Sequence, residues 1–256
     1  MSFEVGIPGG KYTWETWQMI CCRYYIAAPF VTGKQVLEVG CGTGRGLGYL
    51  AARAKRVVGG DYAEDNLRYA REHYKERAEI LVLDAQRLPF KDNSFDVAVA
   101  MEVIYYLTNL SDFFDECHRV LRKGGILCFC LLNKDVPGFH ASPLSRRYYS
   151  VPELFNLLNQ HNFDAELFGA FPVLRGPTWE RIQATAIVTV GKALDKMPKG
   201  RKVREFLSKI ILGRTIGYKP ELDDSDMIAE NLKLIPIPSD SPDNRHKISY
   251  AIAHAR

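Results

Sequence analysis

The chain has 256 residues, of which 46% are apolar, and its Lys and Arg residues exceed its Asp and Glu residues by four. This length and apolar content favour one α/β domain with added elements over two independent domains. A charge of +4 is too small to indicate, by itself, a nucleic-acid-binding or membrane-surface protein. The chain does not begin with a basic segment followed by an apolar one, and its apolar runs stop well short of the roughly 18 residues that span a bilayer. We therefore expect a soluble, cytoplasmic protein.

The first predicted helix covers residues 14–28, which are aromatic and apolar, and we expect it to end before Pro29. From Gln35 onward, short apolar runs alternate with helical stretches. The predicted strands are 35–39, 56–59, 79–83, 95–101 and 125–132, and the predicted helices between them are 44–53, 64–76 and 111–122. Strands that alternate with helices require a parallel sheet covered on both faces.

Glycines and a helix cap mark the second half of this core. Lys123-Gly124-Gly125 predicts the end of helix 111–122 and the immediate start of the next strand. Ser150 is the expected cap of a helix over 152–160, with Glu153 in its acidic first turn. The last two strands are predicted near 165–171 and at 248–253.

Residues 175–247 separate these last two strands and are far too many for a hairpin, so we expect an insertion with its own helices. Its part 175–219 holds eleven Lys or Arg and three Asp or Glu residues, a local charge of +8. Such a segment is either a solvated helical face or a cap that attracts an acidic substrate or surface. The expected organisation is a single domain with four parts: a helical lid at 1–34, a core at 35–174, the insertion at 175–247 and the last strand at 248–256.

The six cysteines form no Cys-x-x-Cys pair and no zinc-binding spacing, so we expect reduced thiols and no metal site. Cys128 and Cys130 alternate within an apolar run. This spacing predicts that both lie on one face of a strand, where a free thiol packs as a small apolar group.

A glycine-rich turn follows the first predicted strand. Residues 38–44 read Glu-Val-Gly-Cys-Gly-Thr-Gly, and Gly40, Gly42 and Gly44 permit a tight bend and a close approach of the backbone to a ligand. The turn lies at the carboxyl end of its strand, where an open parallel sheet has its crevice. Taken alone, the pattern is equally consistent with a turn that binds nothing.

Acidic residues follow the next strands at corresponding places. Asp61 ends the second strand, where its carboxylate can accept hydrogen bonds from both hydroxyls of a ribose, and the adjacent Tyr62 can lay its ring on an adenine. Asp84 and Ala85 close the third strand, where a carboxylate can accept from the amino group of adenine. The fourth strand is closed by Met101 and Glu102.

The turn does not fit a dinucleotide. The fingerprint Gly-x-Gly-x-x-Gly requires a third glycine where this chain has Arg45 or, in the other frame, Leu47. A carboxylate such as Glu38 at the start of the turn would also repel the negatively charged pyrophosphate of a dinucleotide. S-adenosylmethionine carries a sulfonium and an ammonium group, which suit a pocket lined by Glu38, Asp61, Asp84 and Glu102.

As a set, these residues resemble the class I S-adenosylmethionine-dependent methyltransferases, in particular the small-molecule group that includes the ubiquinone and menaquinone methyltransferases. Residues 38–44 are similar to the first motif of that family. Asp61 is similar to the acidic residue that binds the ribose there, and Asp84 to the residue that contacts the adenine. Further similar segments are Leu88-Pro89-Phe90, Ser94-Phe95-Asp96-Val97 and the run from His118 to Gly125. The resemblance covers residues 35–132. It implies a Rossmann-like α/β fold with a seven-stranded, mostly parallel sheet and helices on both faces. The N-terminal helix and the helical insertion before the last strand are added elements inferred from the sequence pattern, and the insertion has no evident counterpart in that family.

The resemblance also implies an enzyme that uses S-adenosylmethionine and moves its methyl group, by in-line displacement, to an O, N or C atom of a small molecule. We expect no nucleic-acid partner and no stable membrane insertion. The acceptor, a secondary metabolite or a quinone-like or lipid-like compound, is expected between the loop 133–150 and the segment 175–235, because the methyl group must face strands four and five.

Two side chains are candidates for proton transfer, and one aromatic for a lid. His140 lies on the loop after strand five and is the leading candidate base, although an exposed loop histidine has the same pattern. Tyr106 is the second candidate, with a role in the pocket wall as the alternative. Tyr12 is expected to fold over the cofactor and to exclude water. Arg146 and Arg147 either grip an anionic group or are solvated.

Other functions stay open at this point. A protein of the same fold can bind S-adenosylmethionine without turnover, or methylate a peptide or another macromolecule. Aminopropyl transfer requires acidic groups for a polyamine, which are not evident. A metal-assisted mechanism is disfavoured because hard cations require several oxygen ligands and the end of strand four offers Glu102 alone. Amino-methylation of nucleic acids is disfavoured because Val103 and Ile104 stand where such enzymes have two prolines.

Overall fold

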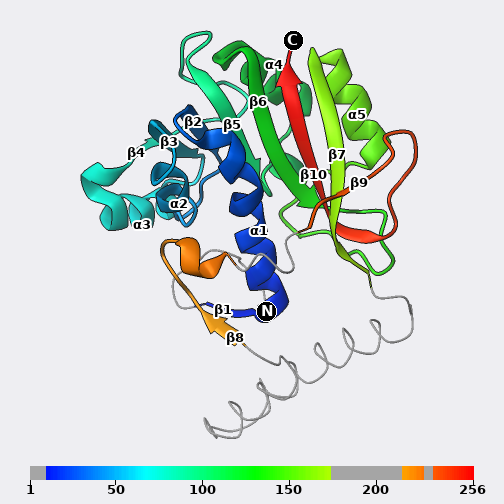
Figure 1. Ribbon diagram of the computed structural model, residues 1–256, viewed down its shortest axis with the longest axis horizontal. Coiled ribbons are helices and arrows are strands. Elements are labelled where there is room, and N and C mark those ends of the chain that lie inside the picture. The colour runs from blue at the N-terminus through cyan, green and yellow to red at the C-terminus, as the bar shows by residue number, and fades with distance from the viewer. Residues whose placement is uncertain (1–9, 174–214, 228–232) are drawn as a thin grey trace, which may run out of the picture.

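The computed structural model describes residues 10–173, 215–227 and 233–256. Its main element is an eight-stranded sheet (Figure 1) with the order β4-β3-β2-β5-β6-β10-β7-β9. The strands are β2 (Gln35–Val39), β3 (Arg56–Asp61), β4 (Glu79–Val82), β5 (Phe95–Met101), β6 (Leu121–Leu132), β7 (Phe163–Pro172), β9 (Ile235–Pro236) and β10 (His246–Ala255). Strands β2 to β6 are parallel to one another, and β10 runs antiparallel between β6 and β7.

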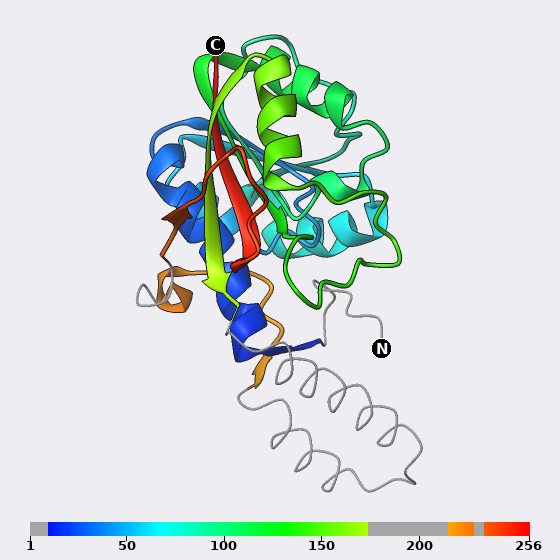
Figure 2. The same cartoon turned by 90° about the vertical axis from the view of Figure 1, so that its right-hand side faces the viewer.

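Helices cover both faces of the sheet, as Figure 2 shows with the sheet turned nearly edge-on. The helices are α1 (Trp14–Val31), α2 (Leu47–Ala51), α3 (Glu64–Tyr74), α4 (Leu110–Val120) and α5 (Val151–Gln160), with short 3₁₀ turns η1 (Lys75–Arg77), η2 (Ile104–Tyr106) and η3 (Asp224–Asp226). Two apolar cores result, one between the sheet and α1, α2 and α3, the other between the sheet and α4 and α5. This confirms the Rossmann-like class, with one more strand than expected because β9 adds a two-residue edge.

All six cysteines are buried and unbonded to one another. Cys128 and Cys130 pack in the same core, so the prediction that they share one face is confirmed. Burial raises the pKa of the Cys128 thiol to about 12, which keeps it protonated.

The end of α1 differs from the prediction, because the helix continues through Pro29 to Val31. Proline cannot donate its backbone hydrogen bond, but Val31 is completely buried. The Thr32 hydroxyl also donates to the carbonyl of Ala28, at 3.3 Å, near the end of the helix. Packing of the last turn therefore outweighs the one missing hydrogen bond.

Two further helix boundaries are also wrong. Helix α4 ends at Val120, before the predicted glycine stop, because Leu121 pairs with Phe95 and is buried. Gly124, with φ of +72°, lies within the register shift that follows. Helix α2 begins only at Leu47, since the left-handed glycine turn occupies the residues before it.

The predicted insertion 175–247 falls largely outside the described residues. Its described parts hold β8 (Thr215–Gly217), η3, β9 and the start of β10, and no α-helix. Strand β8 pairs antiparallel with β1 (Lys11–Thr13), at the start of the described chain. This two-stranded ribbon lies beyond the carboxyl ends of the parallel strands (Figure 1). Within the described residues, no helix combines the length and apolarity needed to cross a bilayer.

The start of α5 is a capping box formed by Ser150 and Glu153, so the predicted cap at Ser150 is confirmed. Substituting Ser150→Ala should lower the free energy of unfolding by about 1 kcal/mol, because a backbone amide of the first turn loses its acceptor. Ser150→Thr keeps the hydroxyl and should retain most of that stability. Urea denaturation of both variants is the test, and equal stability of Ser150→Ala and the unaltered protein would contradict this role.

Candidate active site

The turn between β2 and α2 holds three glycines in the left-handed region, with φ of +73° at Gly40, +56° at Gly42 and +80° at Gly44. A Cβ on Gly40 would lie 2.3 Å from Cγ2 of Val103, and one on Gly44 would lie 2.9 Å from Cβ of Ala70. A Cβ on Gly42 would meet nothing within 4 Å. Gly40 and Gly44 therefore pack the turn closely, whereas Gly42 presents bare backbone on an open side that a ligand can approach.

Asp61, at the carboxyl end of β3, fastens this turn. Its Oδ2 accepts from the amide of Gly42 and its Oδ1 from the amide of Ala63, both at 2.8 Å. Each carboxylate oxygen has a second lone pair, so Asp61 can hold the turn and still accept from the hydroxyls of a ligand. The adjacent Tyr62 is 79% exposed, which leaves its ring accessible to a flat ligand group.

The end of β4 lies beside Asp61. The amide of Leu83 donates to the carbonyl of Asp61 at 3.1 Å, which joins the two strand ends. Asp84 is exposed and accepts from the amide of Gln86 at 2.9 Å, while Ala85 is buried. Asp61, Tyr62 and Asp84 therefore form an accessible acidic and aromatic rim next to the glycine turn.

Glu38 is the buried acid at the base of the turn, with 1% of its surface exposed. The hydroxyl of Tyr24, from α1, donates to its Oε1 at 2.8 Å, whereas its Oε2 is buried without a hydrogen-bond partner among the described residues. Burial raises the pKa of this carboxyl to about 7; the Tyr24 hydrogen bond opposes the rise and the Asp61 charge adds to it. A buried carboxylate oxygen without a partner fits a ligand that brings a positive charge to the turn.

Glu102 closes β5 in a strained left-handed conformation, with φ of +62°. Its Oε2 accepts from the hydroxyl of Tyr105 at 2.8 Å, and its Oε1 lies 3.7 Å from Nη2 of Arg23 on α1. The preceding residue, Met101, is 6% exposed. Glu102 is thus held by side chains of the protein, in contrast to the accessible Asp61 and Asp84.

A row of aromatic rings lines the edge where β5 and β6 end. The ring centroid of Tyr105 lies 4.5 Å from that of Tyr106 and 4.6 Å from that of Tyr148, on which it stacks. The rings of Phe139 and Tyr148 meet edge-on, with their centroids 4.7 Å apart. Burial, followed by the charge of Glu102, holds the pKa of Tyr105 well above its ordinary value, so its hydroxyl stays protonated. Tyr106 is 44% exposed at the end of this row, and His140, next to Phe139, is exposed.

Tyr12, on β1, is 5% exposed and contacts the glycine-turn region through Arg45. The guanidinium of Arg45 donates to the Tyr12 hydroxyl at 2.6 Å and lies 4.7 Å from its ring centroid. The ring centroid of Tyr218, the residue after β8, lies 5.0 Å from the same guanidinium carbon. The amide of Leu222 donates to the carbonyl of Arg45 at 2.9 Å. Arg45, which follows Gly44, therefore contacts β1 through Tyr12 and the chain directly after β8 through Tyr218.

The sequence analysis missed a buried pair at the same edge of the sheet. His246 Nδ1 lies 2.8 Å from Asp243 Oδ2, and both residues are 4% exposed. Asn133, which follows β6, donates from Nδ2 to the carbonyls of Asp243 and His246 at 2.5 and 2.9 Å. The only sequence signal is an Asp and a His three residues apart directly before the last strand, in a segment taken to be an insertion. Arg45 and Tyr218 were missed because nothing local connects them.

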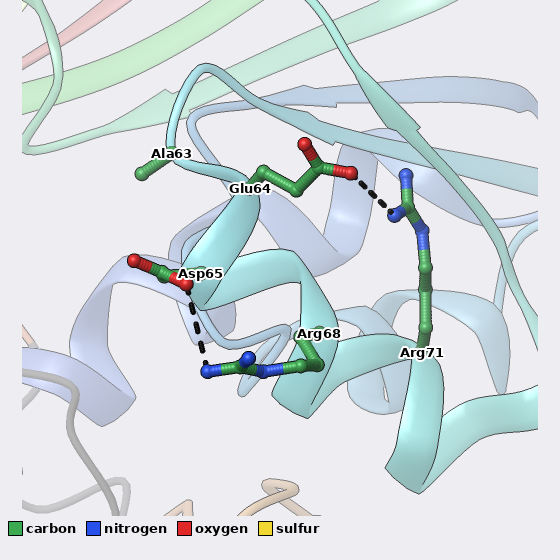
Figure 3. Close-up of a pocket in the computed structure, with 5 residues that line it drawn as sticks. All are labelled: Ala63, Glu64, Asp65, Arg68 and Arg71. Carbon is green, nitrogen blue, oxygen red and sulfur yellow. Dashed lines mark ion pairs between the residues drawn. The ribbon is translucent and has the colours of Figure 1, made fainter.

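A depression on α3 begins two residues after Asp61 and is lined by Ala63, Glu64, Asp65, Arg68 and Arg71 (Figure 3). Its charged groups pair with one another: Glu64 lies 3.7 Å from Arg71, and Asp65 lies 3.5 Å from Arg68. These charges are satisfied within the helix, so the open glycine turn is the better candidate for a ligand. Among the residues that the structure describes, no group of three or more His, Cys, Asp or Glu side chains is arranged to hold a metal ion.

Comparisons with known proteins agree with this geometry. Residues 37–129 match the family model described as a methyltransferase domain. A Mycolicibacterium smegmatis protein named "Probable S-adenosylmethionine-dependent methyltransferase" is 37% identical over 147 residues, which are 56% of this chain and 57% of that protein. Demethylmenaquinone methyltransferase of Clavibacter sepedonicus is 32% identical over 142 residues, or 54% of each chain. The matches thus span a little over half the length of these curated relatives.

Two crystal structures share the fold over nearly the whole chain. An S-adenosylmethionine-dependent methyltransferase of Thermotoga maritima has a TM-score of 0.56 and 17% identity, with 95% of both chains covered. The [4+2]-cyclase SpnF has a TM-score of 0.57 and 20% identity, with 97% of this chain and 87% of SpnF covered. At such identities the likeness shows the fold alone.

The fold is that of a Rossmann-like α/β protein. The match of residues 37–129 to the methyltransferase-domain model, together with the relatives named above, confirms the resemblance inferred from the sequence. The cofactor that this resemblance implies is S-adenosylmethionine. The open Gly42 backbone and the unpartnered oxygen of Glu38 fit that cofactor, which carries two positive groups.

The raised pKa of Glu38 predicts a pH-dependent affinity for S-adenosylhomocysteine. Below pH 7 the carboxyl is largely protonated, so a ligand with an ammonium group must expel that proton to gain a carboxylate partner. Affinity should rise as pH increases from 6 to about 7 and then level off. Glu38→Gln should remove this slope, and Asp84→Asn should keep it. Calorimetry in buffers with different ionisation enthalpies measures the proton release, and a wild-type affinity independent of pH would contradict the role.

Proposed function

We propose that the protein is an S-adenosylmethionine-dependent methyltransferase that acts on a small, largely apolar acceptor. The observation that supports this most directly is the open turn at Gly42, fastened by Asp61 beside the exposed Tyr62. In the proposed arrangement the turn and its acids form one unit, the core at 35–174, with 1–34 as its lid and 175–247 as an insertion ahead of the last strand.

In this proposal each end of the cofactor has its own partners. Asp61 accepts from the ribose hydroxyls, Tyr62 stacks on the adenine, and Asp84 with Ala85 borders the adenine amino group. The backbone at Gly40, Gly42 and Gly44 lies against the ligand, and Glu38 balances its positive charge. Met101 and Glu102 border the methyl-bearing end. When bound, the cofactor supplies an electrophilic methyl group on its sulfonium.

Tyr12 is proposed to act in the lid, although it does so through a neighbour. Its hydroxyl and ring engage Arg45, which couples the ribbon of β1 and β8 to the turn. A ribbon held in this way shields the turn from water. Tyr12→Ala should therefore weaken cofactor binding without unfolding the core, and an unchanged affinity would remove Tyr12 from the lid.

The aromatic row supports an apolar acceptor of quinone-like or lipid-like type. Tyr106 is the exposed end of this row, and the rings of Tyr105, Tyr148 and Phe139 pack behind it, so an acceptor would meet a mainly aromatic surface there. The name of the Clavibacter relative, a demethylmenaquinone methyltransferase, gives an example of such an acceptor. The rate then depends mainly on holding the acceptor atom close to the methyl group and in line with the bond that breaks.

Proton removal is needed only for an acceptor that carries a proton with a high pKa. His140 is exposed on the loop beside the aromatic row and is one candidate, and Tyr106 is a second. His246 is a further candidate, because Asp243 orients its Nδ1 and its Nε2 has no hydrogen-bond partner among the described residues. If His246→Asn loses turnover and His140→Ala does not, at equal cofactor affinity, His246 is the residue that removes the proton.

The alternative is a protein of this fold that uses the cofactor site without methyl transfer. SpnF is named as a [4+2]-cyclase although it shares the fold over 97% of this chain, so the fold alone permits other chemistry. Such a protein would bind S-adenosylmethionine and S-adenosylhomocysteine and yield no methylated product. Methylation of a peptide or another macromolecule is a further alternative, and it would require an open groove at the aromatic row.

Isothermal titration with S-adenosylhomocysteine tests the cofactor assignment. The protein should bind it more tightly than NAD, because the turn lacks the third glycine of the dinucleotide fingerprint and Glu38 opposes a pyrophosphate. Asp61→Ala should weaken binding by about 1–3 kcal/mol, since the ribose hydroxyls lose their acceptor. Asp61→Asn retains one acceptor oxygen, so it should lose less binding free energy than Asp61→Ala. Tighter binding of NAD would overturn the assignment.

Transfer of a labelled methyl group tests the acceptor class. A demethylated quinol and a medium-chain fatty acid are suitable apolar probes, compared with a short peptide of mixed sequence. We expect product with an apolar probe, and Tyr106→Ala should raise its KM several-fold by removing the exposed end of the wall. Tyr69→Ala, a partly exposed tyrosine on α3, is the matched control. Methylation of the peptide alone would favour the macromolecular alternative, and no product from any probe would favour the binding protein.

A further inference from the structure

The loop between β6 and α5 contains a tight turn at residues 142–145. The carbonyl of Ser142 accepts from the amide of Ser145 at 3.0 Å and from its hydroxyl at 2.6 Å. The amide of Leu144 donates to Oγ of Ser142 at 3.4 Å. Pro143 and Leu144 therefore form the corner of a turn that is hydrogen-bonded on both sides.

The base of this turn is fixed to the aromatic row of the proposed acceptor site. The amide of Arg146 donates to the carbonyl of Tyr105 at 2.7 Å, and the amide of Ser142 donates to the hydroxyl of Tyr148 at 3.4 Å. The Tyr105 and Tyr148 rings stack on each other. The turn is thus a fixed projection, and its loop lies at the edge of the molecule where the parallel strands end (Figure 2).

The projection carries apolar groups into solvent. The side chain of Leu144 is 70% exposed, the highest value among the exposed aliphatic residues that the structure describes, and Pro143 is exposed beside it. A single exposed leucine on a surface is ordinary. This one differs because a rigid turn holds it outward, so the chain cannot bury it by a small rearrangement.

Positive charge adjoins the apolar corner. Arg146 and Arg147 are both exposed, and Arg147 pairs with Glu153 at 2.8 Å. Lys134 shares that same carboxylate at 2.6 Å, whereas Arg146 has no ion pair within the described residues.

We propose that the turn 142–145 docks this edge on an anionic lipid surface, with Pro143 and Leu144 inserted among the lipid chains and Arg146 against the headgroups. Apolar residues flanked by cations favour the boundary between headgroups and chains of an anionic bilayer. A protein partner would need a far larger complementary area, about 800 Å² on each side, than one turn provides. The proposal deepens the proposed function, because docking would bring lipid-like acceptors to the aromatic row, and the lipid contact itself is measured without methyl transfer.

Flotation with lipid vesicles tests the docking directly. The full-length protein should float with vesicles of phosphatidylcholine mixed with phosphatidylglycerol, and much less with phosphatidylcholine alone. Leu144→Ser should weaken the binding about tenfold, because the inserted apolar surface is lost. Arg146→Gln should weaken binding and reduce its dependence on salt. Tyr69→Ser changes an exposed aromatic on α3 and should leave flotation unchanged.

Titration with S-adenosylhomocysteine accompanies each variant and should show unaltered affinity, which separates this proposal from the proposed function. Absence of flotation, equal flotation with neutral vesicles, or flotation indifferent to Leu144→Ser would overturn the docking. Capture of a protein through Leu144 without any vesicle binding would overturn it in favour of a protein partner. Vesicle binding that persists in a protein unable to bind S-adenosylhomocysteine would support the docking and count against the cofactor assignment alone.

Discussion

The rest of the site depends on the backbone of one turn, in which all three left-handed residues are glycine. Positive φ angles at Gly40, Gly42 and Gly44 bend the chain directly from β2 into α2. The close contact of Gly40 with Val103 brings the end of β5 against this turn, and the amide of Gly42 draws in Asp61 from the end of β3. A side chain at Gly40 would displace Val103 and separate two strand ends that the proposed cofactor must bridge.

Around this turn, segments that are distant in the chain are joined by a few polar and aromatic contacts. Arg45 contacts β1 through Tyr12 and the residue after β8, Tyr218. Tyr105 joins Glu102 to the loop before α5 through its hydroxyl, its ring and its carbonyl. The proposed cofactor and acceptor sides therefore lie along the same edge of the sheet. A substitution at Tyr12 or at Tyr105 should therefore affect elements that are far away in the sequence.

The strand pattern and the acids at strand ends could be predicted because both are local. An apolar run identifies each strand, and Asp61, Asp84 and Glu102 each follow such a run directly, so the parallel topology brings them to one edge. Helix ends were predicted less well, since Val31 and Leu121 are kept in place by burial that no local pattern reveals. The Arg45 contacts depend on pairing of β1 with β8, across some two hundred residues. Pairing over such a distance leaves no signal in a single sequence.

The central claim is that the turn with Asp61 holds the adenosine part of S-adenosylmethionine, with the methyl end directed to the aromatic row. A crystal structure of the protein with S-adenosylhomocysteine tests this most directly. The account predicts both ribose hydroxyls within hydrogen-bond distance of Asp61, the adenine against Tyr62, and the sulfur on the side of Tyr106. A nucleoside bound away from the turn, or a sulfur directed away from the ends of β5 and β6, would contradict it.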